Sequence, residues 1–371
     1  MSRNLTIAAA RSGKLNSLQP LALALGVLAA EGCGSETTTE AAVSAQSLHM
    51  MIGPEGGSLV GQPGTAFEGV KLVIPEGALL EPTDIAIEPL HDASPLPAGS
   101  VACGPLFELS PSGLSLAKPA TLTLPFSENA VSENYRFDDE VKVWWLGPEG
   151  WGQREQVDSS EGAVSVEISA LRGGGAGVNP PDEQDLVHID FQPNPSVLRC
   201  FAQYPDDPER QPVVSADVVR GDLNDGLFLK GKYIKPELQF DLFSIERSFL
   251  TADGTVDPAF HGFGFAWYQS DLEANEQGSM RASIRTILLD QIFGFDPDAK
   301  LAPTNAFELG FWFNDPNDAA ACGFDVTKPT PFNGEHRAGP LAMTTVPDAK
   351  TGLGPLCTKP DTSVSPARCD P

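Results

Sequence analysis

The sequence predicts an all-β protein that contains two β-sandwich-like domains. Short runs of alternating apolar and polar residues recur along the chain, and each run is bounded by Gly, Pro or Asp. The 371 residues include 36 glycines and 33 prolines, which interrupt the chain too often for long helices. This length suffices for two ordinary domains, and a hydrophobic content of 41% can supply their cores.

The charge of the chain excludes one class of partner. Fifty Asp and Glu residues stand against 24 Lys and Arg residues, which gives a formal net charge of −26. Binding to nucleic acid draws its affinity from clustered basic side chains, and this sequence has no basic run longer than a pair. We therefore expect no nucleic-acid partner.

Residues 1–32 have the three-part layout of an export signal. Arg3, Arg11 and Lys14 precede an apolar stretch over residues 21–30, and Gly32 then leads to Cys33. A membrane-spanning helix needs roughly 20 apolar residues, so this stretch is too short to be one. No later segment comes closer to that length, and we expect the mature protein to have no transmembrane helix.

A cysteine directly after such a segment resembles the lipobox of bacterial lipoproteins. The resemblance implies that Cys33 becomes a lipid-modified N-terminus, and several acyl chains on one residue would anchor the protein stably. It also implies residence in the cell envelope, at the outer membrane of a Gram-negative bacterium. Ala30 and Glu31 depart from the usual lipobox, so ordinary signal cleavage near Ala30 stays open as the alternative.

Residues 33–50 are small and polar, and their composition predicts a flexible tether. Removal of residues 1–33 takes away three basic residues and one acidic residue, which changes the net charge from −26 to −28. Such a charge favours solubility and attracts divalent cations in general, without defining a site for them.

Residues 51–171 form the first predicted domain, and their apolar pattern has a period of two. Alternation of this kind, with a turn signal about every ten residues, is typical of an antiparallel sandwich. The clearest predicted strands lie at residues 70–74, 84–87, 120–124 and 164–168.

Four short motifs follow one another through this domain. They are Ile52-Gly53 with Gly56-Gly57, then LVIPEGAL at 72–79, then TDI at 83–85, and finally LSPSG at 109–113 leading into KPATL at 118–122. In this order and spacing they resemble the ZU-five domain, which occurs in zonula occludens proteins, netrin receptors, ankyrins and many bacterial envelope proteins. The resemblance implies a scaffold or adhesion module without catalysis of its own.

A Gly- and Pro-rich run at residues 172–185 predicts a linker between the two domains. Three successive glycines and Pro180-Pro181 favour neither a strand nor a helix. Residues 186–371 then form a second β-rich domain of no recognised family. Its alternating runs include Leu238 to Leu242 and Ile284 to Leu288, and one short helix is expected at residues 315–321.

The second domain holds four of the six cysteines, and an even count in an exported chain predicts two disulfides. The four are Cys200, Cys322, Cys357 and Cys369. Three pairings exist, and the favoured ones join Cys357 to Cys369 or Cys322 to Cys357, since either would tie down a tail with little apolar content. Cys103 stands alone in the first domain and reads as a small buried hydrophobe.

An aromatic group in the second domain is a candidate carbohydrate platform. It comprises Trp267, Tyr268 and Trp312, with Phe313 next in the chain. The polar residues beside it are Gln269, Asp271, Asn314 and Asp315. A pyranose face stacks on an exposed ring while its hydroxyls bond to amides and carboxylates. The alternative is that these aromatics alternate into the core, as strand aromatics often do.

Asp222, Asn224 and Asp225 suggest a calcium loop only weakly. Their spacing departs by one residue from the usual calcium loop, and the distal Glu is missing, so a polar turn explains them as well. No spacing typical of zinc occurs, and we expect no cofactor unless one of the acidic loops holds calcium. As a catalytic base His336 would need a nucleophile, and no sequence motif in the chain supplies one, so a loop histidine that forms hydrogen bonds is expected.

These observations predict a lipid-anchored envelope protein that works by binding, adhesion or scaffolding and not by catalysis. Its expected partners are the membrane, through the anchor, and a surface polysaccharide or an envelope protein. Two alternatives stay open. A surface hydrolase acting on polysaccharide or peptide would need two convergent carboxylates, or His336 with a hydroxyl. A passive spacer would bury both Trp267 and Trp312.

Overall fold

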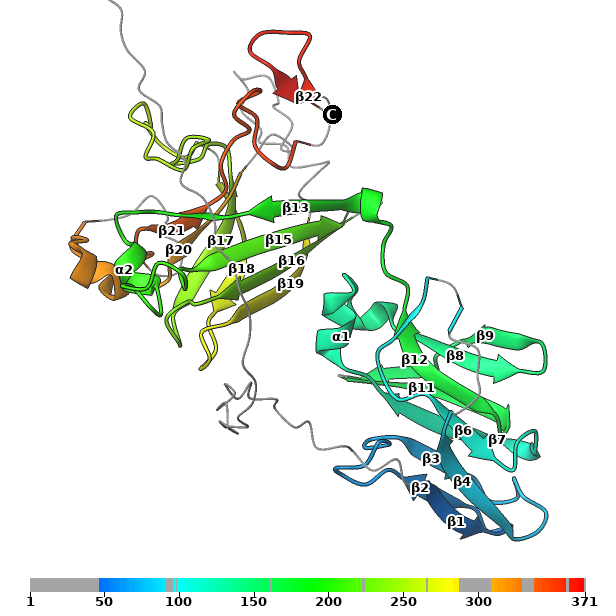
Figure 1. Ribbon diagram of the computed structural model, residues 1–371. Helices are drawn as coiled ribbons and strands as arrows, with labels where there is room; N and C mark the ends of the chain where they lie inside the picture. The colour runs from blue at the N-terminus through cyan, green and yellow to red at the C-terminus, as the bar shows by residue number, and fades with distance from the viewer. Residues whose placement is uncertain are drawn as a thin grey trace, which may run out of the picture. The chain divides into compact units, whose positions relative to one another are not determined.

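A computed structural model describes the chain from residue 47 onward (Figure 1). The described ranges are 47–90, 96–97, 99–160, 162–219, 221, 224–264, 266–286, 308–328, 337–357 and 360–369. The predicted export signal and Cys33 lie outside them. Within these ranges, no helix combines the length and the apolar character that crossing a membrane requires.

The first part of the structure is a sandwich of two antiparallel sheets, as the alternating pattern predicted. The first sheet has the order β1-β4-β6-β12-β8-β9, with β5 paired to β12. Its strands are β1 (Leu48–Ile52), β4 (Thr83–Pro89), β5 (Val101–Ala102), β6 (Phe107–Ser110), β8 (Lys142–Gly147), β9 (Gly150–Arg154) and β12 (Gly173–Val178). The tether predicted over residues 33–50 therefore ends earlier, because Leu48 already pairs with Ile87.

The second sheet has the order β10-β11-β7-β3-β2. Its strands are β2 (Gly57–Val60), β3 (Lys71–Ile74), β7 (Ser115–Pro125), β10 (Asp158–Ser160) and β11 (Ala163–Ala170). The helix α1 (Glu128–Glu133) and the 3₁₀ turn η1 (Asp138–Glu140) lie between β7 and β8. Ile74 and Leu79 are buried on either side of Gly77, which has a φ of 78° and so makes a turn that a side chain would strain.

The glycine run after residue 172 is not a linker, and that prediction is wrong for residues 173–178. These residues form β12, a fully buried strand that pairs with β6 and β8 at the centre of the first sheet. A Cβ on Gly174 would lie 2.7 Å from the Trp145 ring, and one on Gly175 would lie 2.4 Å from the Leu106 side chain. Glycine is needed here because neighbouring side chains contact the backbone directly.

The second part of the structure is another sandwich of two antiparallel sheets. The sheet β13-β15-β16-β19 faces the sheet β14-β21-β20-β17-β18 (Figure 1). We call them sheet C and sheet D. Sheet C contains β13 (Leu186–Asp190), β15 (Val213–Val219), β16 (Asp225–Lys232) and β19 (Met280–Thr286). Sheet D contains β14 (Gln192–Pro193), β17 (Gln239–Ile245), β18 (Ala266–Glu273), β20 (Glu308–Phe313) and β21 (Leu341–Thr344).

Helices contribute little to the second sandwich. The 3₁₀ turn η2 (Glu183–Asp185) precedes it, and the short helix α2 (Leu198–Phe201) contributes Phe201 to its core. The helix expected at 315–321 is present as the 3₁₀ helix η4 (Pro316–Cys322), which Asp315 caps by accepting from the backbone N–H of Asn317. The hairpin of β22 (Pro360–Asp361) and β23 (Arg368–Cys369) lies near the end of the described chain.

Two apolar clusters organise the second sandwich. The larger lies between sheets C and D and includes Phe201, Phe240, Phe311 and Phe313. The smaller lies on the opposite side of sheet D, which we call its outer face, and comprises Ile245, Trp312, Ala338 and Leu341. Sheet D is thus buried on both sides around β20, and every residue of that strand is buried.

Candidate functional site

The outer face of sheet D carries a group of polar and aromatic side chains beside the smaller apolar cluster. Tyr268 and Asp271 belong to β18, Asp241 to β17, and Asn314 directly follows β20. We call these four residues the Tyr268 patch. The register pairs Tyr268 with Phe243 and Asp271 with Asp241, which brings the two aspartates side by side on one face.

A bulge brings Tyr268 and Asp271 together. Side chains three residues apart on a regular strand point to opposite faces, because successive side chains alternate. The register shifts between Leu242 and Phe243, so that β18 holds one extra residue at this point. Both side chains therefore lie on the outer face, and the Tyr268 hydroxyl donates to the Asp271 carboxylate at 2.7 Å.

The Tyr268 ring is held on two sides but stays half exposed. Its ring centroid lies 5.7 Å from that of Phe243, in an edge-to-face contact, while Asp271 holds its hydroxyl. Partial burial, together with the charges of Asp271 and Asp241, raises the pKa of Tyr268 to about 12. The phenol is therefore a neutral hydrogen-bond donor over the whole physiological range, and Tyr268 is 49% exposed to solvent.

Asn314 and Asp241 form the other half of the patch. The Asn314 side-chain amide donates to Asp241 at 2.9 Å, and Asp241 is only 4% exposed. Asp241 pairs across the sheet with Trp312, whose ring packs against Phe243 and Phe263. The patch thus rests on a packed aromatic layer, and its amide and carboxylate are fixed in place.

The structure separates the three aromatic residues of the predicted carbohydrate platform. Trp312 is 1% exposed, so it cannot present a ring to a ligand and its assignment to the platform is wrong. Phe243 and Phe263 cover it from outside, which a pattern of alternation does not reveal. Trp267 is 51% exposed, but it pairs with Ser244 and so points to the side of β18 opposite Tyr268. Of the four residues expected in the platform, Tyr268 and Asn314 lie on the outer face of sheet D, where they bond to Asp271 and Asp241 respectively.

Sequence reasoning missed Asp241. It lies between Phe240 and Leu242, in an alternating strand where a polar residue is expected to face solvent. Its burial follows from the aromatic layer on the outer face of sheet D, which only tertiary structure reveals. The sequence offered no signal that would have identified Asp241.

A second buried carboxyl lies at the start of β20. Glu308 is 3% exposed, and burial raises its pKa to about 7, although the Thr345 hydroxyl donates to it. The backbone N–H of Leu309 donates to the same hydroxyl at 2.9 Å. This arrangement ties β20 to the chain after β21, and we assign it a structural role.

The calcium candidates do not form a common site among the described residues. Asp222 lies outside those residues, Asn224 is exposed, and Asp225 is buried at the start of β16. Asp225 accepts from the backbone N–H of Gly221 at 3.4 Å, which is a turn contact. Across the described ranges, no three His, Cys, Asp or Glu side chains gather as a metal site would require. His336 lies outside those ranges.

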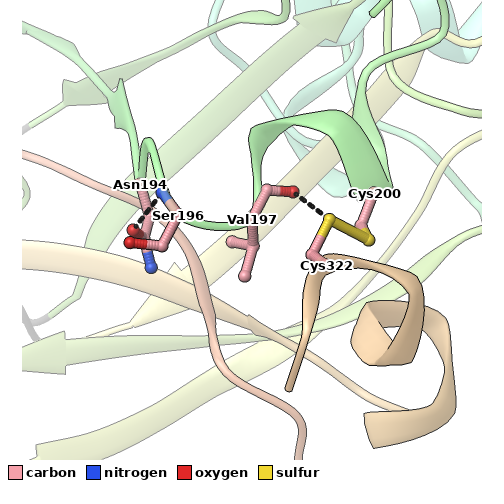
Figure 2. The surroundings of a disulfide bond; sticks show 5 residues. All are labelled: Asn194, Ser196, Val197, Cys200 and Cys322. Atoms are coloured by element: carbon pink, nitrogen blue, oxygen red, sulfur yellow. Dashed lines mark hydrogen bonds between the residues drawn. A yellow bond between two sulfur atoms is a disulfide. The ribbon is translucent and has the colours of Figure 1, made fainter.

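The four cysteines of the second sandwich form two disulfides. Cys357 bonds to Cys369, which is the first of the two favoured pairings, and Cys200 bonds to Cys322. Figure 2 shows the second bond, which joins α2 to η4; the Cys322 sulfur lies 3.7 Å from the Val197 carbonyl oxygen. Cys103 is a free, buried thiol, as expected, and burial raises its pKa.

Comparison with known families agrees with the resemblance seen in the motifs. The family model of the ZU5 domain, written ZU-five above, matches residues 48–138. No curated protein matches the chain. ZU5 is a non-catalytic protein-interaction domain. The match covers strands β1 to β7, α1 and the start of η1, and it ends before the strands β8 to β12 that complete the same sandwich.

Proposed function

We propose that this protein is an exported, lipid-anchored protein of the cell envelope that acts by binding or scaffolding. The layout of residues 1–33 supports export and lipid attachment at Cys33. The two disulfides support an oxidising compartment, because such bonds persist mainly in exported proteins. An acidic body behind a polar tether suits a protein held at the outer membrane of a Gram-negative bacterium.

In this proposal, each of the two sandwiches binds a different partner. The ZU5 match supports a protein partner for the first sandwich, since ZU5 domains mediate protein-protein interactions. The Tyr268 patch supports a ligand for the second sandwich. The observation that carries this assignment is the half-exposed Tyr268 ring, held by Phe243 and Asp271 beside a fixed amide and a fixed carboxylate.

The chemistry of the patch favours a polysaccharide over an apolar ligand. A sugar ring buries its C–H face on an aromatic ring, and its hydroxyls bond to amides and carboxylates. The patch offers both kinds of group on one face. Asp241 and Asp271, in a chain of net charge −26, would repel uronate or sulfate groups, so the expected ligand is a neutral or amino sugar polymer.

One experiment tests the patch directly. The full mature chain, made in an oxidising compartment, is tested on a glycan array and by pull-down on isolated cell wall. Tyr268→Ala should weaken binding about tenfold or more, since loss of about 1.4 kcal/mol of contact corresponds to a factor of ten. Trp267→Ala is the matched control, because it removes an equally exposed ring from the same strand on the opposite side.

The outcomes separate the proposal from its alternatives. If Tyr268→Ala binds glycans as well as Trp267→Ala does, the patch is not a sugar site, and a protein partner is left as the ligand of the second sandwich. Release of shortened glycans would favour a hydrolase. A passive spacer was expected to bury both tryptophans, whereas Trp267 is 51% exposed.

A further inference from the structure

The outer face of sheet C, the side away from sheet D, is contacted by a segment of the first sandwich. The two sandwiches belong to one compact unit of the chain. The contacting segment, residues 133–140, runs from the last residue of α1 through η1. It contacts Phe228 on β16 and Arg281 and Arg285 on β19.

Aromatic rings form the centre of this contact. The ring centroids of Tyr135 and Phe137 lie 5.8 Å and 5.1 Å from that of Phe228. A Cβ on Gly226 would lie 3.2 Å from the Phe137 ring, so the absence of a side chain there leaves space for the ring. Tyr135 adopts a positive φ of 57°, an uncommon conformation for a residue with a side chain, at the point where the segment turns after α1.

Ion pairs surround the aromatic centre. Arg285 binds both carboxylate oxygens of Asp139, through Nη1 at 2.7 Å and through Nη2, and lies 3.7 Å from Glu140. Arg281 lies 3.0 Å from Glu133. The Arg285 guanidinium also lies over the Phe137 ring, 4.3 Å from its centroid. Arg285 in turn holds the pKa of Asp139 below its usual value.

The charges of the two surfaces are complementary. Residues 133–140 contain four acidic residues and one arginine, and residues of β16 and β19 facing them include Lys230, Arg281 and Arg285. This is a basic surface in a chain with twice as many acidic as basic residues. The side chains of these ion pairs are 39% to 62% exposed, so each pair contributes little alone and is screened by salt.

We propose that residues 133–140 and the outer face of sheet C form an electrostatic latch between the two sandwiches. The stacked rings supply the apolar contact, while the ion pairs fix its register. Salt screening or loss of the ring contact opens the latch and frees the basic face of sheet C. The latch does not rest on the proposed polysaccharide site, which lies on the other sheet.

A zero-length cross-link tests the latch in the full chain. The Arg281→Lys variant places a primary amine beside Glu133, and a carbodiimide then joins the two side chains where they meet. Mass spectrometry should find the peptide pair that links positions 281 and 133. Adding Phe137→Ala, or raising the salt to about 0.5 M, should reduce its yield several-fold, because the Debye length then falls to a few ångströms.

A matched variant controls for the chemistry. Arg199 lies 2.8 Å from Asp206 within the second sandwich, and both side chains are exposed. Arg199→Lys should give a 199–206 cross-link that Phe137→Ala leaves unchanged. In the Arg281→Lys background, Arg285→Asp should lower the 281–133 yield, and adding Asp139→Arg should restore it. This reversal of charge keeps the test valid if Phe137→Ala does not fold.

Two results would overturn the latch. One is a 281–133 cross-link whose yield, divided by the yield of the 199–206 control, stays the same in all three tests. These tests are the Phe137→Ala substitution, the charge reversal and the rise in salt. The other is a cross-link found only between isotope-labelled and unlabelled copies, which would place the contact between two molecules.

Discussion

The hydroxyl of Tyr268 donates to the carboxylate of Asp271 at 2.7 Å, although three residues separate the two along one strand. The bulge opposite Leu242 and Phe243 makes this bond feasible, because it places both side chains on the outer face of sheet D. The bond holds the hydroxyl end of the Tyr268 ring in place. It also links the titration of Tyr268 to the charge of Asp271.

Replacing Asp271 should therefore change the pKa of Tyr268. Burial raises this pKa most, and the bond and charge of Asp271 raise it further, to about 12. Asp271→Asn removes the charge, so the pKa should fall while staying above its ordinary value of about 10, because burial remains. Ultraviolet titration of phenolate, with Tyr268→Phe as the reference, measures the shift. An unchanged titration would show that Asp271 does not act on the phenol.

The glycines of β12 should not tolerate a methyl group. Gly174→Ala and Gly175→Ala each place a Cβ closer than 3 Å to a neighbouring side chain. Overpacking of this kind costs typically 1–3 kcal/mol, and chemical denaturation would measure the loss. Gly152→Ala, on β9 of the same sheet, is the control, since a Cβ there meets nothing within 4 Å and the loss should be absent. Equal stability of all three variants would contradict the packing described.

His188 should make stability depend on pH. The hydrogen bond with Asp217, at 2.6 Å, and the nearby Asp190 raise the pKa of His188 above its ordinary value. A raised folded-state pKa gives stability that is present below the unfolded pKa and is lost as pH rises through the folded pKa. The advantage of the unsubstituted chain over His188→Gln should therefore be larger at pH 5.5 than at pH 9.

Urea midpoints at several pH values measure that advantage. His261→Gln serves as the control, because the ring of His261 contacts the Ala259 carbonyl oxygen in place of a carboxylate. A His188 effect that grows as pH rises would reverse the assigned sign.

The two disulfides should contribute unequally. Cys200 and Cys322 are 122 residues apart, while Cys357 and Cys369 are 12 apart. By the loop-closure relation the longer loop contributes about 5 kcal/mol and the shorter about 3 kcal/mol. Cys200→Ser with Cys322→Ser should thus lower the unfolding midpoint more than Cys357→Ser with Cys369→Ser. The opposite ranking would point to strain or residual structure in place of loop entropy.

Lipid attachment predicts a simple labelling result. In a bacterium with the lipoprotein pathway, the full precursor should incorporate labelled palmitate and separate with the membrane fraction. Cys33→Ala should abolish both, while Cys103→Ala should affect neither, because Cys103 is buried inside the first sandwich. Export of an unlabelled, soluble chain from the unsubstituted precursor would favour ordinary cleavage near Ala30.

Alternation predicted the strands well where one face of a strand is polar. The runs at residues 70–74 and 164–168 became β3 and β11, whose side chains alternate between the core and the outer surface. It failed for β12, since a strand buried on both sides and built from glycine has no alternation to detect. The rule that glycine interrupts structure then indicated a linker, although these glycines make room for Trp145 and Leu106.

The candidate site was only partly predictable for a related reason. Trp267 and Tyr268 are adjacent in sequence and equally exposed, yet they face opposite sides of β18. The sequence around Trp312 does not distinguish it from an exposed aromatic residue, but Phe243 and Phe263 cover its ring. The exposure of an aromatic side chain on a strand depends on which segment from elsewhere in the chain packs over it. The neighbouring sequence does not contain that information.

The position of β12 also orders the folding of the first sandwich. It is the last strand of that sandwich to be synthesised, yet it lies between β6 and β8 in the middle of its sheet. The six earlier strands of that sheet must therefore wait as an open arrangement, or as two separate halves, until residue 178 has joined them. Such late, long-range pairing is slow, and a chain cut at the end of the ZU5 match would lack the strand that closes the sheet.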